Sequence, residues 1–280
     1  MLIFAPANPV TMLLFPNAKI NIGLNIVEKR PDGFHNIESC FYPVGWSDAL
    51  EVTLAETFSF HADGISIPGN ASDNLCIRAY EMLAKDYHLS PVKIHLLKTV
   101  PIGAGLGGGS ADAAFTIKAL NQLFDLGISV DEQEQYARRI GSDCAFFIRN
   151  KPVYCFEKGD QFDTIDISIS GKWIVLVNPG IHISTVEAYS GVVAKRSAED
   201  LRTILSQPIS EWKGHVKNDF EATLFAKYPL LAETKEKLYS LGAEYAAMSG
   251  SGSTLFGIFE GELNAKPHFP DFRLWQGILK

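Results

Sequence analysis

A cluster of glycines in the middle of the chain is the first feature that could carry chemistry. Residues 100–114 read VPIGAGLGGGSADAA, with five glycines in seven positions, directly before a run with helical periodicity. Each glycine costs conformational entropy on folding, so the cluster indicates backbone that another group approaches closely. Bare amides at the start of a helix attract anions, because unpaired N–H groups and the helix dipole both favour negative charge. The stretch therefore predicts an anion site, with a flexible loop or tight helix packing as the alternative.

Two common nucleotide-binding motifs fit this cluster poorly. Gly103, Gly105 and Gly108 satisfy the spacing G-x-G-x-x-G, and Asp125 follows about 20 residues on, as in a Rossmann site. However, Asp125 ends a helical run rather than a strand, Pro101 interrupts the step from strand to loop, and no parallel strand is evident afterwards. A Walker loop is excluded, because no Gly-Lys-Ser/Thr follows the glycines.

Lys19 with Asn21, and Asp143, are two further candidates for functional residues. Lys19 and Asn21 fall on the polar face of an alternating segment at 17–30, which predicts a half-buried strand; a solvated face is the simple alternative. Asp143 is expected to open a short apolar helix (CAFFI), where a plain N-cap is the simple alternative. A helix N-terminus also keeps a carboxylate ionised, and a neighbouring lysine would do so more strongly.

The elements that must position these residues mix strands and helices. Because they do not alternate strictly, the pattern predicts an α+β fold rather than a doubly wound sheet. A capping box at Ser129 and Glu132 marks the start of one helix, which ends near Ile140. The other expected strands lie at 48–54, 58–62, 92–100, 172–180 and 255–259, and the other expected helices at 74–87, 110–124 and 229–241.

Composition narrows the class of partner. The chain has 280 residues, of which 46% are hydrophobic and 20% charged, and a formal net charge of −7. No stretch concentrates Lys and Arg, so neither a nucleic acid nor an anionic membrane is an expected partner. The N-terminal run MLIFAPANPVTMLLFP lacks a basic start and is too short to span a bilayer; Met12 is an alternative start, with residues 1–11 as an extension. Four scattered cysteines without metal-ligand spacing predict reduced thiols and a cytoplasmic protein.

Three motifs, taken in order, resemble the GHMP family of small-molecule kinases. They are PNAKINIGL near the N-terminus, PIGAGLGGGSADAA in the middle and AAMSGSGSTLFGIF near the C-terminus. The resemblance implies the two-lobed α+β GHMP kinase fold. Residues 1–160 would form a ribosomal-protein-S5-like lobe with the glycine loop and the catalytic residues, and 161–280 a ferredoxin-like lobe. ATP and substrate would meet in the cleft.

Finer marks resemble particular members of that family. They are the sequence N-A-K-I-N, R-x-D-G-[FY]-H downstream of it, the triple glycine, G-S-D, and I-S-T ahead of an aromatic residue. Members with these marks transfer a phosphoryl group from ATP to the 2-hydroxyl of a cytidine-diphosphate-linked methylerythritol, in the non-mevalonate route to isoprenoid precursors. The resemblance thus implies ATP and Mg²⁺ as cofactors and a small-molecule substrate.

The resemblance also implies roles for individual residues. Lys19 and Asp143 match the catalytic pair: Asp143 would take the proton of the attacking hydroxyl, and Lys19 would keep Asp143 ionised and orient that hydroxyl. Asn21, Phe34, His35, Thr185 and Tyr189 match substrate contacts, with His35 at the cytosine edge and the two aromatic residues on either side of the base. The nucleotide loop matches Pro101, Ile102, Gly103, Ala104, Gly105, Leu106, Gly107, Gly108, Gly109, Ser110 and Ala111.

The chain departs from the family pattern at several of these positions. Phe34 stands where tyrosine is usual, and Tyr189 where phenylalanine is common; stacking survives both changes. No protein ligand for Mg²⁺ is assigned, because the loop reads G-G-S-A-D instead of carrying the wider family's S-S-A, and the glutamate that helps to hold the ion in that family is not identified. The third motif, at residues 249–253, would brace the glycine loop or line the cleft.

Two other functions remain as alternatives. One is another GHMP kinase that acts on mevalonate-type or amino-acid hydroxyls, and the other is a binding protein of the same fold without activity. The DGFH turn and the aromatic pair favour cytidine, because a base needs flat apolar walls. The presence of both Lys19 and Asp143 argues against a pure binder, which has no need of a base.

Overall fold

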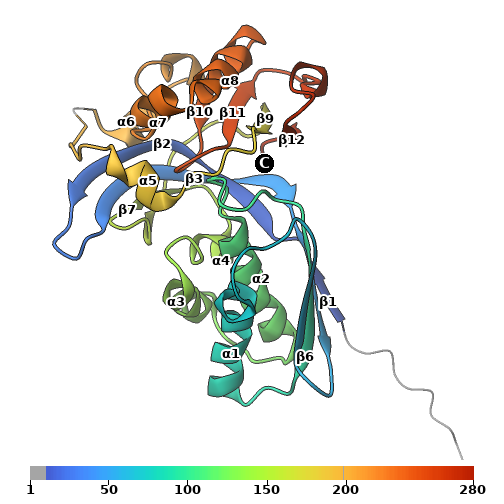
Figure 1. The fold of residues 1–280 in the computed structure, drawn as a ribbon. Coiled ribbons are helices and arrows are strands. Elements are labelled where there is room, and N and C mark those ends of the chain that lie inside the picture. Colours follow the sequence, from blue (N-terminus) through green and yellow to red (C-terminus); the bar gives the residue numbers. More distant parts are fainter. Residues whose placement is uncertain (1–10, 198) are drawn as a thin grey trace, which may run out of the picture. The chain divides into compact units, whose positions relative to one another are not determined.

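The computed structural model describes residues 11–197 and 199–280 and divides into two compact units (Figure 1). Of the described residues, unit 1 comprises Thr11–Asn17, Ser47–Val100 and Gly108–Arg149. Unit 2 comprises Ala18–Trp46, Pro101–Gly107 and Asn150–Lys280. Each unit is assembled from separate stretches of the sequence, and the lobe boundary expected at residue 160 stays a prediction.

Unit 1 is built on a four-stranded sheet of order β1-β4-β6-β5. Strands β4 and β6 alternate in burial: Leu50, Val52, Ile94 and Leu96 are buried, whereas the residues between them are exposed or half-buried. This alternation gives the sheet one core face and one open face. The strands are β1 (Thr11–Leu14), β4 (Ala49–Leu54), β6 (Val92–Lys98) and β5 (Ser59–Gly64), antiparallel except for β5 and β6.

Helices pack on the core face of this sheet. Helix α2 contacts both β1 and β4, and α1 packs against α2 (Figure 1). The side chain of Asn74 caps α1, and the predicted capping box of Ser129 and Glu132 at the start of α3 is confirmed. The helices of unit 1 are η1 (Ala71–Asp73), α1 (Leu75–Tyr87), α2 (Gly108–Leu123), α3 (Val130–Ile140) and α4 (Phe146–Arg149).

Two helix starts differ from the sequence prediction. Helix α2 begins at Gly108, two residues earlier than expected, so the last two glycines of the cluster belong to its first turn. Helix α4 begins only at Phe146, so the prediction that Asp143 opens this helix was wrong. Bonds from Cys144 N to Gly141 O and from Phe147 N to Cys144 O form tight turns first. Asp143 therefore lies in a turn and not at a helix cap.

Unit 2 contains two further four-stranded sheets. The first has order β2-β3-β7-β8 and the second β10-β11-β9-β12. Their strands are β2 (Asn17–Lys29), β3 (His35–Ser47), β7 (Val153–Phe156), β8 (Gln161–Asp163), β10 (Tyr245–Met248), β11 (Leu255–Phe259), β9 (Trp173–Asn178) and β12 (Arg273–Ile278). The helices are α5 (Thr185–Ser190), α6 (Leu201–Leu205), η2 (Ile209–Glu211), α7 (Glu221–Lys227), α8 (Pro229–Ser240) and η3 (Lys266–His268).

Strand β2 departs from the predicted half-buried pattern. Its apolar residues are buried as expected, but Lys19 and Asn21 on the other face are only 4% and 2% exposed. The prediction of a half-buried strand was therefore wrong, and so was the alternative of a solvated polar face. Periodicity shows that two faces differ in polarity, but it does not show whether the polar face is also covered.

The arrangement confirms the α+β class and excludes a Rossmann unit around the glycines. Strand β6 runs into the glycine stretch and α2 follows, but the next strand, β7, belongs to a different sheet. A dinucleotide fold needs a parallel strand beside β6 after this helix. In the parts of the chain that the structure describes, no helix has the length and apolar character needed to cross a bilayer. The segment 1–10, which includes most of the expected N-terminal extension, lies outside the described residues.

Candidate active site

Lys19 and Asn21 form a buried polar cluster on β2 of unit 2. The ammonium of Lys19 donates to Asn21 Oδ1 and lies 4.5 Å from the centroid of the Phe41 ring. Asn21 Nδ2 donates in turn to Ser39 Oγ at 2.9 Å, and Ser39 Oγ donates to the carbonyl of Gly23 at 2.5 Å. Burying a cation is unfavourable unless neutral dipoles and π-faces compensate. The cluster therefore holds the ammonium in a fixed position.

The residues predicted to bind the base partly come together in unit 2. His35, at the start of β3, stacks on Tyr189 of α5, with ring centroids 4.6 Å apart and an interplanar angle of 22°. Tyr189 also meets the buried Phe220 edge-on at 4.9 Å. Thr185 is the first residue of α5, and the side chain of Ser184 caps that helix. The helix thus fixes Thr185 and Tyr189 one turn apart.

The protonation state of His35 suits recognition of a base edge. Partial burial and the nearby Lys29 lower the pKa of His35. At neutral pH the imidazole is therefore uncharged and offers one donor and one acceptor nitrogen. A cytosine edge presents both kinds of group.

Phe34 differs from the other candidates in its exposure. Its side chain is 58% exposed, and Lys158 Nζ lies 5.4 Å from the ring centroid. His35 already occupies a stacking face of Tyr189. A base can lie against that face only after the imidazole moves. Placement of a base between Phe34 and Tyr189 stays a prediction.

The glycine loop of unit 2 is braced by the third motif, residues 249–253. Ser249 Oγ donates to the carbonyl of Gly105 at 2.8 Å, and Thr254 N donates to the carbonyl of Ala104. The same serine oxygen accepts a bond from Asn21 N at 3.1 Å. One side chain therefore ties the loop to the strand that carries Lys19, as the bracing alternative for this motif predicted.

The positions in the glycine cluster require glycine for different physical reasons. Gly105 has φ +78°, and a Cβ there would lie 1.9 Å from the carbonyl oxygen of Ser249, so packing alone demands glycine. Gly107 has φ +68°, a conformation that branched residues avoid. Gly109 has neither constraint: it is exposed in the first turn of α2, and a Cβ would meet only a Leu75 methyl at 3.9 Å. Close approach of a ligand is a sufficient reason for glycine at that position.

Asp143 and Ser110 lie around one buried thiol in unit 1. A hydrogen bond with Ser110 lowers the pKa of Cys144 and the charge of Asp143 raises it, but burial dominates and brings the value to about 12. Arg78 of α1 also lowers the pKa of this thiol. The carboxylate and the hydroxyl therefore both lie near the N-terminal turn of α2, in which Gly109 is exposed.

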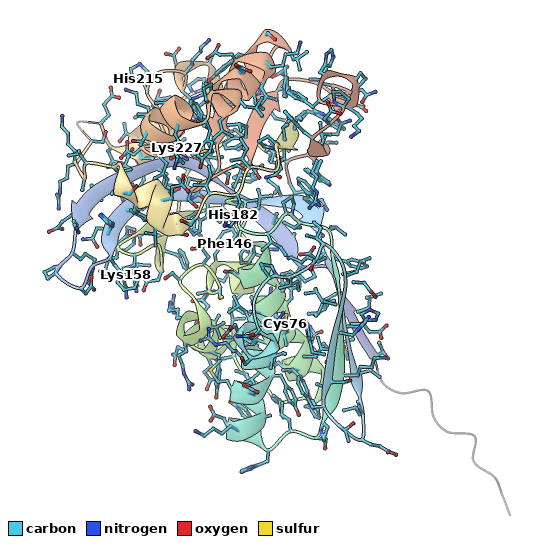
Figure 2. All side chains as sticks on the ribbon, in the orientation of Figure 1. Cys76, Phe146, Lys158, His182, His215 and Lys227 are labelled. Carbon is cyan, nitrogen blue, oxygen red and sulfur yellow. The ribbon has the colours of Figure 1, made fainter. Side chains whose placement is uncertain are left out.

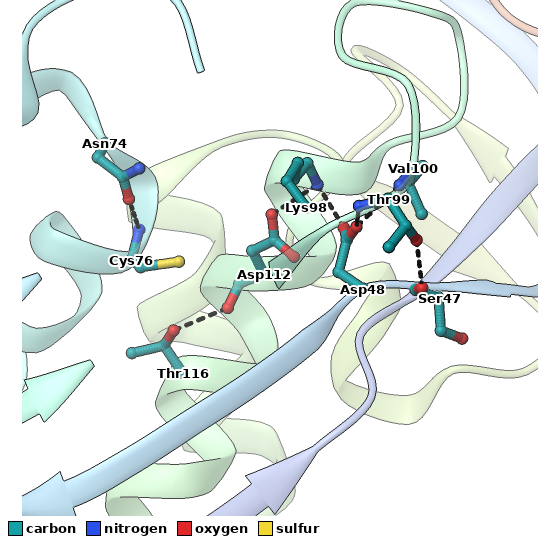
Figure 3. Close-up of polar contacts among 9 residues, drawn as sticks. All are labelled: Ser47, Asp48, Asn74, Cys76, Lys98, Thr99, Val100, Asp112 and Thr116. Carbon is teal, nitrogen blue, oxygen red and sulfur yellow. Dashed lines mark hydrogen bonds and ion pairs between the residues drawn. The ribbon is translucent and has the colours of Figure 1, made fainter. Parts of the chain in front are cut away.

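A buried ion triad that sequence reasoning missed holds β6 to α2 (Figure 3). Lys98, the last residue of β6, donates to Asp112 Oδ2 at 2.7 Å and to Asp48. The second oxygen of Asp48 accepts bonds from Thr99 N and Val100 N at 2.6 and 2.8 Å. The three charged side chains are at most 4% exposed. They fix the point at which the chain leaves the sheet for the glycine loop.

The triad carries one excess negative charge, and this shifts a pKa. Burial, opposed by Lys98 and reinforced by Asp48, raises the pKa of Asp112 to about 7. Its Oδ1 atom has no hydrogen-bond partner among the described residues. The sequence does hold a signal for this cluster: Lys98 continues the buried phase of Val92, Ile94 and Leu96. A lysine in that phase needs buried partners.

Comparisons with known proteins show which family this chain belongs to. Models of the GHMP kinases N terminal domain and of the GHMP kinases C terminal region match residues 74–151 and 195–267. The chain is 54% identical over 257 residues to a 4-diphosphocytidyl-2-C-methyl-D-erythritol kinase of Cytophaga hutchinsonii, covering 91% of this chain and 94% of the relative. It is 49% identical to the kinase of the same name from Bacteroides fragilis, covering 90% and 93%.

A solved structure is also similar over nearly its full length. A crystal structure of a 4-(cytidine 5'-diphospho)-2C-methyl-D-erythritol kinase superposes with a TM-score of 0.80 at 29% identity, covering 95% of this chain and 98% of the other. The chain belongs to the GHMP kinase family. Its fold class and its enzyme class, a small-molecule kinase, are thereby confirmed.

The excess charge of the triad leads to a prediction about stability. Lys98→Met would leave two buried carboxylates uncompensated and is expected to lower the free energy of unfolding by about 3–5 kcal/mol. Asp112→Asn keeps the pair of Lys98 and Asp48 and is expected to be much milder. Denaturant unfolding of both variants and the parent at one pH compares the two. Equal losses would contradict the assignment of Asp112 as the excess charge.

The parent protein and the Asp112→Asn variant together also test the raised pKa of Asp112. Because this pKa is raised on folding, the native state binds more protons than the unfolded chain between about pH 4 and 7. The stability that protonation of Asp112 contributes is present at low pH and is lost as pH rises through about 7. The asparagine variant lacks this loss, so its unfolding free energy should gain on the parent between pH 5 and 8. A difference that does not vary with pH would contradict the shift.

Proposed function

We propose that this protein transfers the γ-phosphoryl group of ATP to the 2-hydroxyl of 4-diphosphocytidyl-2-C-methyl-D-erythritol, a step toward isoprenoid precursors by the non-mevalonate route. One observation carries the proposal: the relatives of that name at 49–54% identity match 90–91% of this chain and 93–94% of their own length. Likeness on this scale spans both the glycine loop and the segment with Phe34 and His35. The structure supports the proposal with a fixed buried ammonium and an exposed helix start.

In the proposed reaction, Asp143 accepts the proton of the attacking 2-hydroxyl as phosphorus–oxygen bond formation begins. Lys19 supplies positive charge to the reacting groups from its buried position on β2. Phosphoryl transfer depends mainly on positioning and charge stabilisation, so two side chains and a set of amides are sufficient. Both roles are assigned by matching the family's motifs.

The triphosphate is assigned to the stretch from Pro101 to Ala111. The first turn of α2, where Gly109 is exposed, offers backbone amides and the positive end of a helix dipole. Mg²⁺ would neutralise charge on the β- and γ-phosphates, and such ions are commonly held by phosphate oxygens, water and one or two carboxylates. Ser110, in that turn, and Asp143 can each offer a side-chain oxygen.

For the substrate, we propose that the cytosine edge binds His35 and that aromatic rings cover its faces. The neutral imidazole can satisfy both a donor and an acceptor, and Phe34 and Tyr189 provide the rings. Asn21 and Thr185 are proposed as further contacts. The chain's four cysteines are buried thiols, and we propose a cytoplasmic enzyme that works without a nucleic-acid or membrane partner.

The proposed substrate is tested by an ADP-release assay with a panel of alcohols. 4-Diphosphocytidyl-2-C-methyl-D-erythritol is expected to support turnover, whereas mevalonate and homoserine are not. Release of ADP with one of the latter would replace the proposal by another kinase of the family. Absence of ADP release with every alcohol, despite ATP binding, would favour a binding protein.

The role of Asp143 predicts a specific loss of turnover. Asp143→Asn is expected to lower kcat by about 10²–10⁴-fold, the usual contribution of a general base, with little change in the affinity for ATP. The matched control is Asp125→Asn, at an exposed position of the same unit where φ is +49° and asparagine is tolerated. Steady-state kinetics and nucleotide titration compare both with the parent. Retention of half the parent rate by Asp143→Asn would remove Asp143 from this role.

The exposed glycine of α2 predicts a loss of ATP binding without a loss of stability. A methyl group at Gly109 has room within the chain, and alanine favours a helix by about 0.5–1 kcal/mol over glycine. Gly109→Ala should therefore keep or raise Tm and still weaken ATP binding, because the methyl group stands where phosphates approach. Gly261→Ala, with no atom within 4 Å of its Cβ, is the control. Unchanged ATP affinity in Gly109→Ala would leave only packing reasons for these glycines.

Base stacking predicts a change in KM at Tyr189. Stacking on an aromatic ring is worth about 1–3 kcal/mol per base, so Tyr189→Ala should raise KM for the cytidylylated substrate tenfold or more, with a smaller effect on kcat. Tyr189→Phe keeps the ring and should be close to neutral. Because Tyr189 also packs on Phe220, Tm is measured on both variants. An alanine variant with parent Tm and parent KM would disprove the stacking.

A further inference from the structure

The open face of the unit 1 sheet carries two histidines and a carboxylate that the proposed kinase reaction does not use. His61 and Asp63 lie on β5 and His95 on β6. Their side chains are 62%, 55% and 38% exposed, respectively. All three point away from the core face, whose residues on β6 are Ile94 and Leu96.

The strand register brings these side chains together. His61 and His95 are direct partners in the parallel pairing of β5 and β6, and their ring centroids are 5.0 Å apart. Asp63 is two residues beyond His61 and therefore on the same face. Its two oxygens lie 3.3 Å from His61 Nε2 and 2.7 Å from His95 Nε2. The ligand atoms of the three residues all lie within 4.8 Å of one another, and in residues 11–197 and 199–280 no other three His, Cys, Asp or Glu side chains meet this spacing.

We propose that His61, Asp63 and His95 form a binding site for a divalent transition metal of the zinc class. Two imidazoles and a carboxylate are ligands that Zn²⁺ accepts, and bonds of about 2.0–2.1 Å in a tetrahedral array place donor atoms roughly 3.3 Å apart. The distances from the Asp63 oxygens to both imidazoles are already close to this value. Only the two histidine nitrogens have to approach each other, and exposed side chains rotate freely enough to allow it.

The neighbouring charges favour a cation at this place. Glu51 of β4 lies directly across from His95 in the antiparallel register and is exposed on the same face, so it can offer a fourth oxygen. Lys93 is the cation on this face of β6, two residues from His95. The two carboxylates, Asp63 and Glu51, outweigh it.

The donor set separates this site from the Mg²⁺ of phosphoryl transfer. Mg²⁺ prefers octahedral oxygen ligands, whereas imidazole suits zinc and related metals. The site also shares no residue with the proposed kinase site. Strand β5 is the edge of its sheet, so a metal bound by both strands would cross-link that edge to β6. A bound metal would thus protect the edge from fraying.

The test measures metal binding by the intact protein without an affinity tag. Co²⁺ is titrated and followed by its visible absorption, Zn²⁺ is added in competition, and excess Mg²⁺ is present throughout. The variants are His61→Gln, Asp63→Asn and His95→Gln. The control is His215→Gln, which removes an exposed histidine that pairs with one carboxylate, Glu199, at 3.1 Å (Figure 2). Tm of the metal-free proteins shows that each variant is folded.

The expected result is one equivalent of Co²⁺, displaced by Zn²⁺ and unaffected by Mg²⁺. Each of the three variants should weaken binding at least about tenfold, whereas His215→Gln should not. Zn²⁺ should raise Tm of the parent and of the control but not of His95→Gln. Absence of saturable binding, or equal affinity in the parent and His95→Gln, would overturn the proposal.

Discussion

The buried ion triad of Lys98, Asp48 and Asp112 is the constraint around which unit 1 is organised. Asp48 precedes β4, Lys98 ends β6, and Asp112 lies in the second turn of α2, so three separate segments meet at one ammonium. A buried ion pair is weak as a source of stability but strict in its geometry, because breaking it leaves a charge without solvent. The end of β6 and the start of α2 are therefore fixed relative to each other, and the glycine stretch is anchored at both ends.

The strictness of this arrangement extends to single atoms. The second oxygen of Asp48 accepts hydrogen bonds from the amides of Thr99 and Val100, at the point where the strand ends. A Cβ at Gly108 would lie 2.9 Å from Lys98 Nζ, so the first residue of α2 is glycine because the ammonium lies beside it. The helix start that we assign to the phosphates is thus shaped by an electrostatic requirement in the core.

In unit 2 the glycine loop is held by neutral hydrogen bonds and not by an ion triad. Ser249 bonds both the glycine loop, at Gly105, and the strand with Lys19, through Asn21 N. Asn218 holds the same turn from the other side, donating to the carbonyls of Met248 and Gly250. Neutral hydrogen bonds are sufficient here, because the groups being positioned are backbone amides and one ammonium. The third motif therefore acts as a structural brace whose contacts reach residues proposed for catalysis.

The sequence by itself determined the family, the α+β class and most element positions, because these depend on local pattern: alternation in β2 and β6, capping at Ser129, and glycine runs before α2. It could not show that the polar face of β2 is covered, since burial of Lys19 and Asn21 depends on segments far away in the chain. Nor could it distinguish the causes of the glycines at 105 and 109, which depend on what lies near each Cβ. Only the tertiary structure showed which carboxylates surround Lys98, because packing of α2 on the sheet brings Asp112 to it. It alone also showed the cluster of His61, Asp63 and His95, because strand register joins residues more than thirty positions apart.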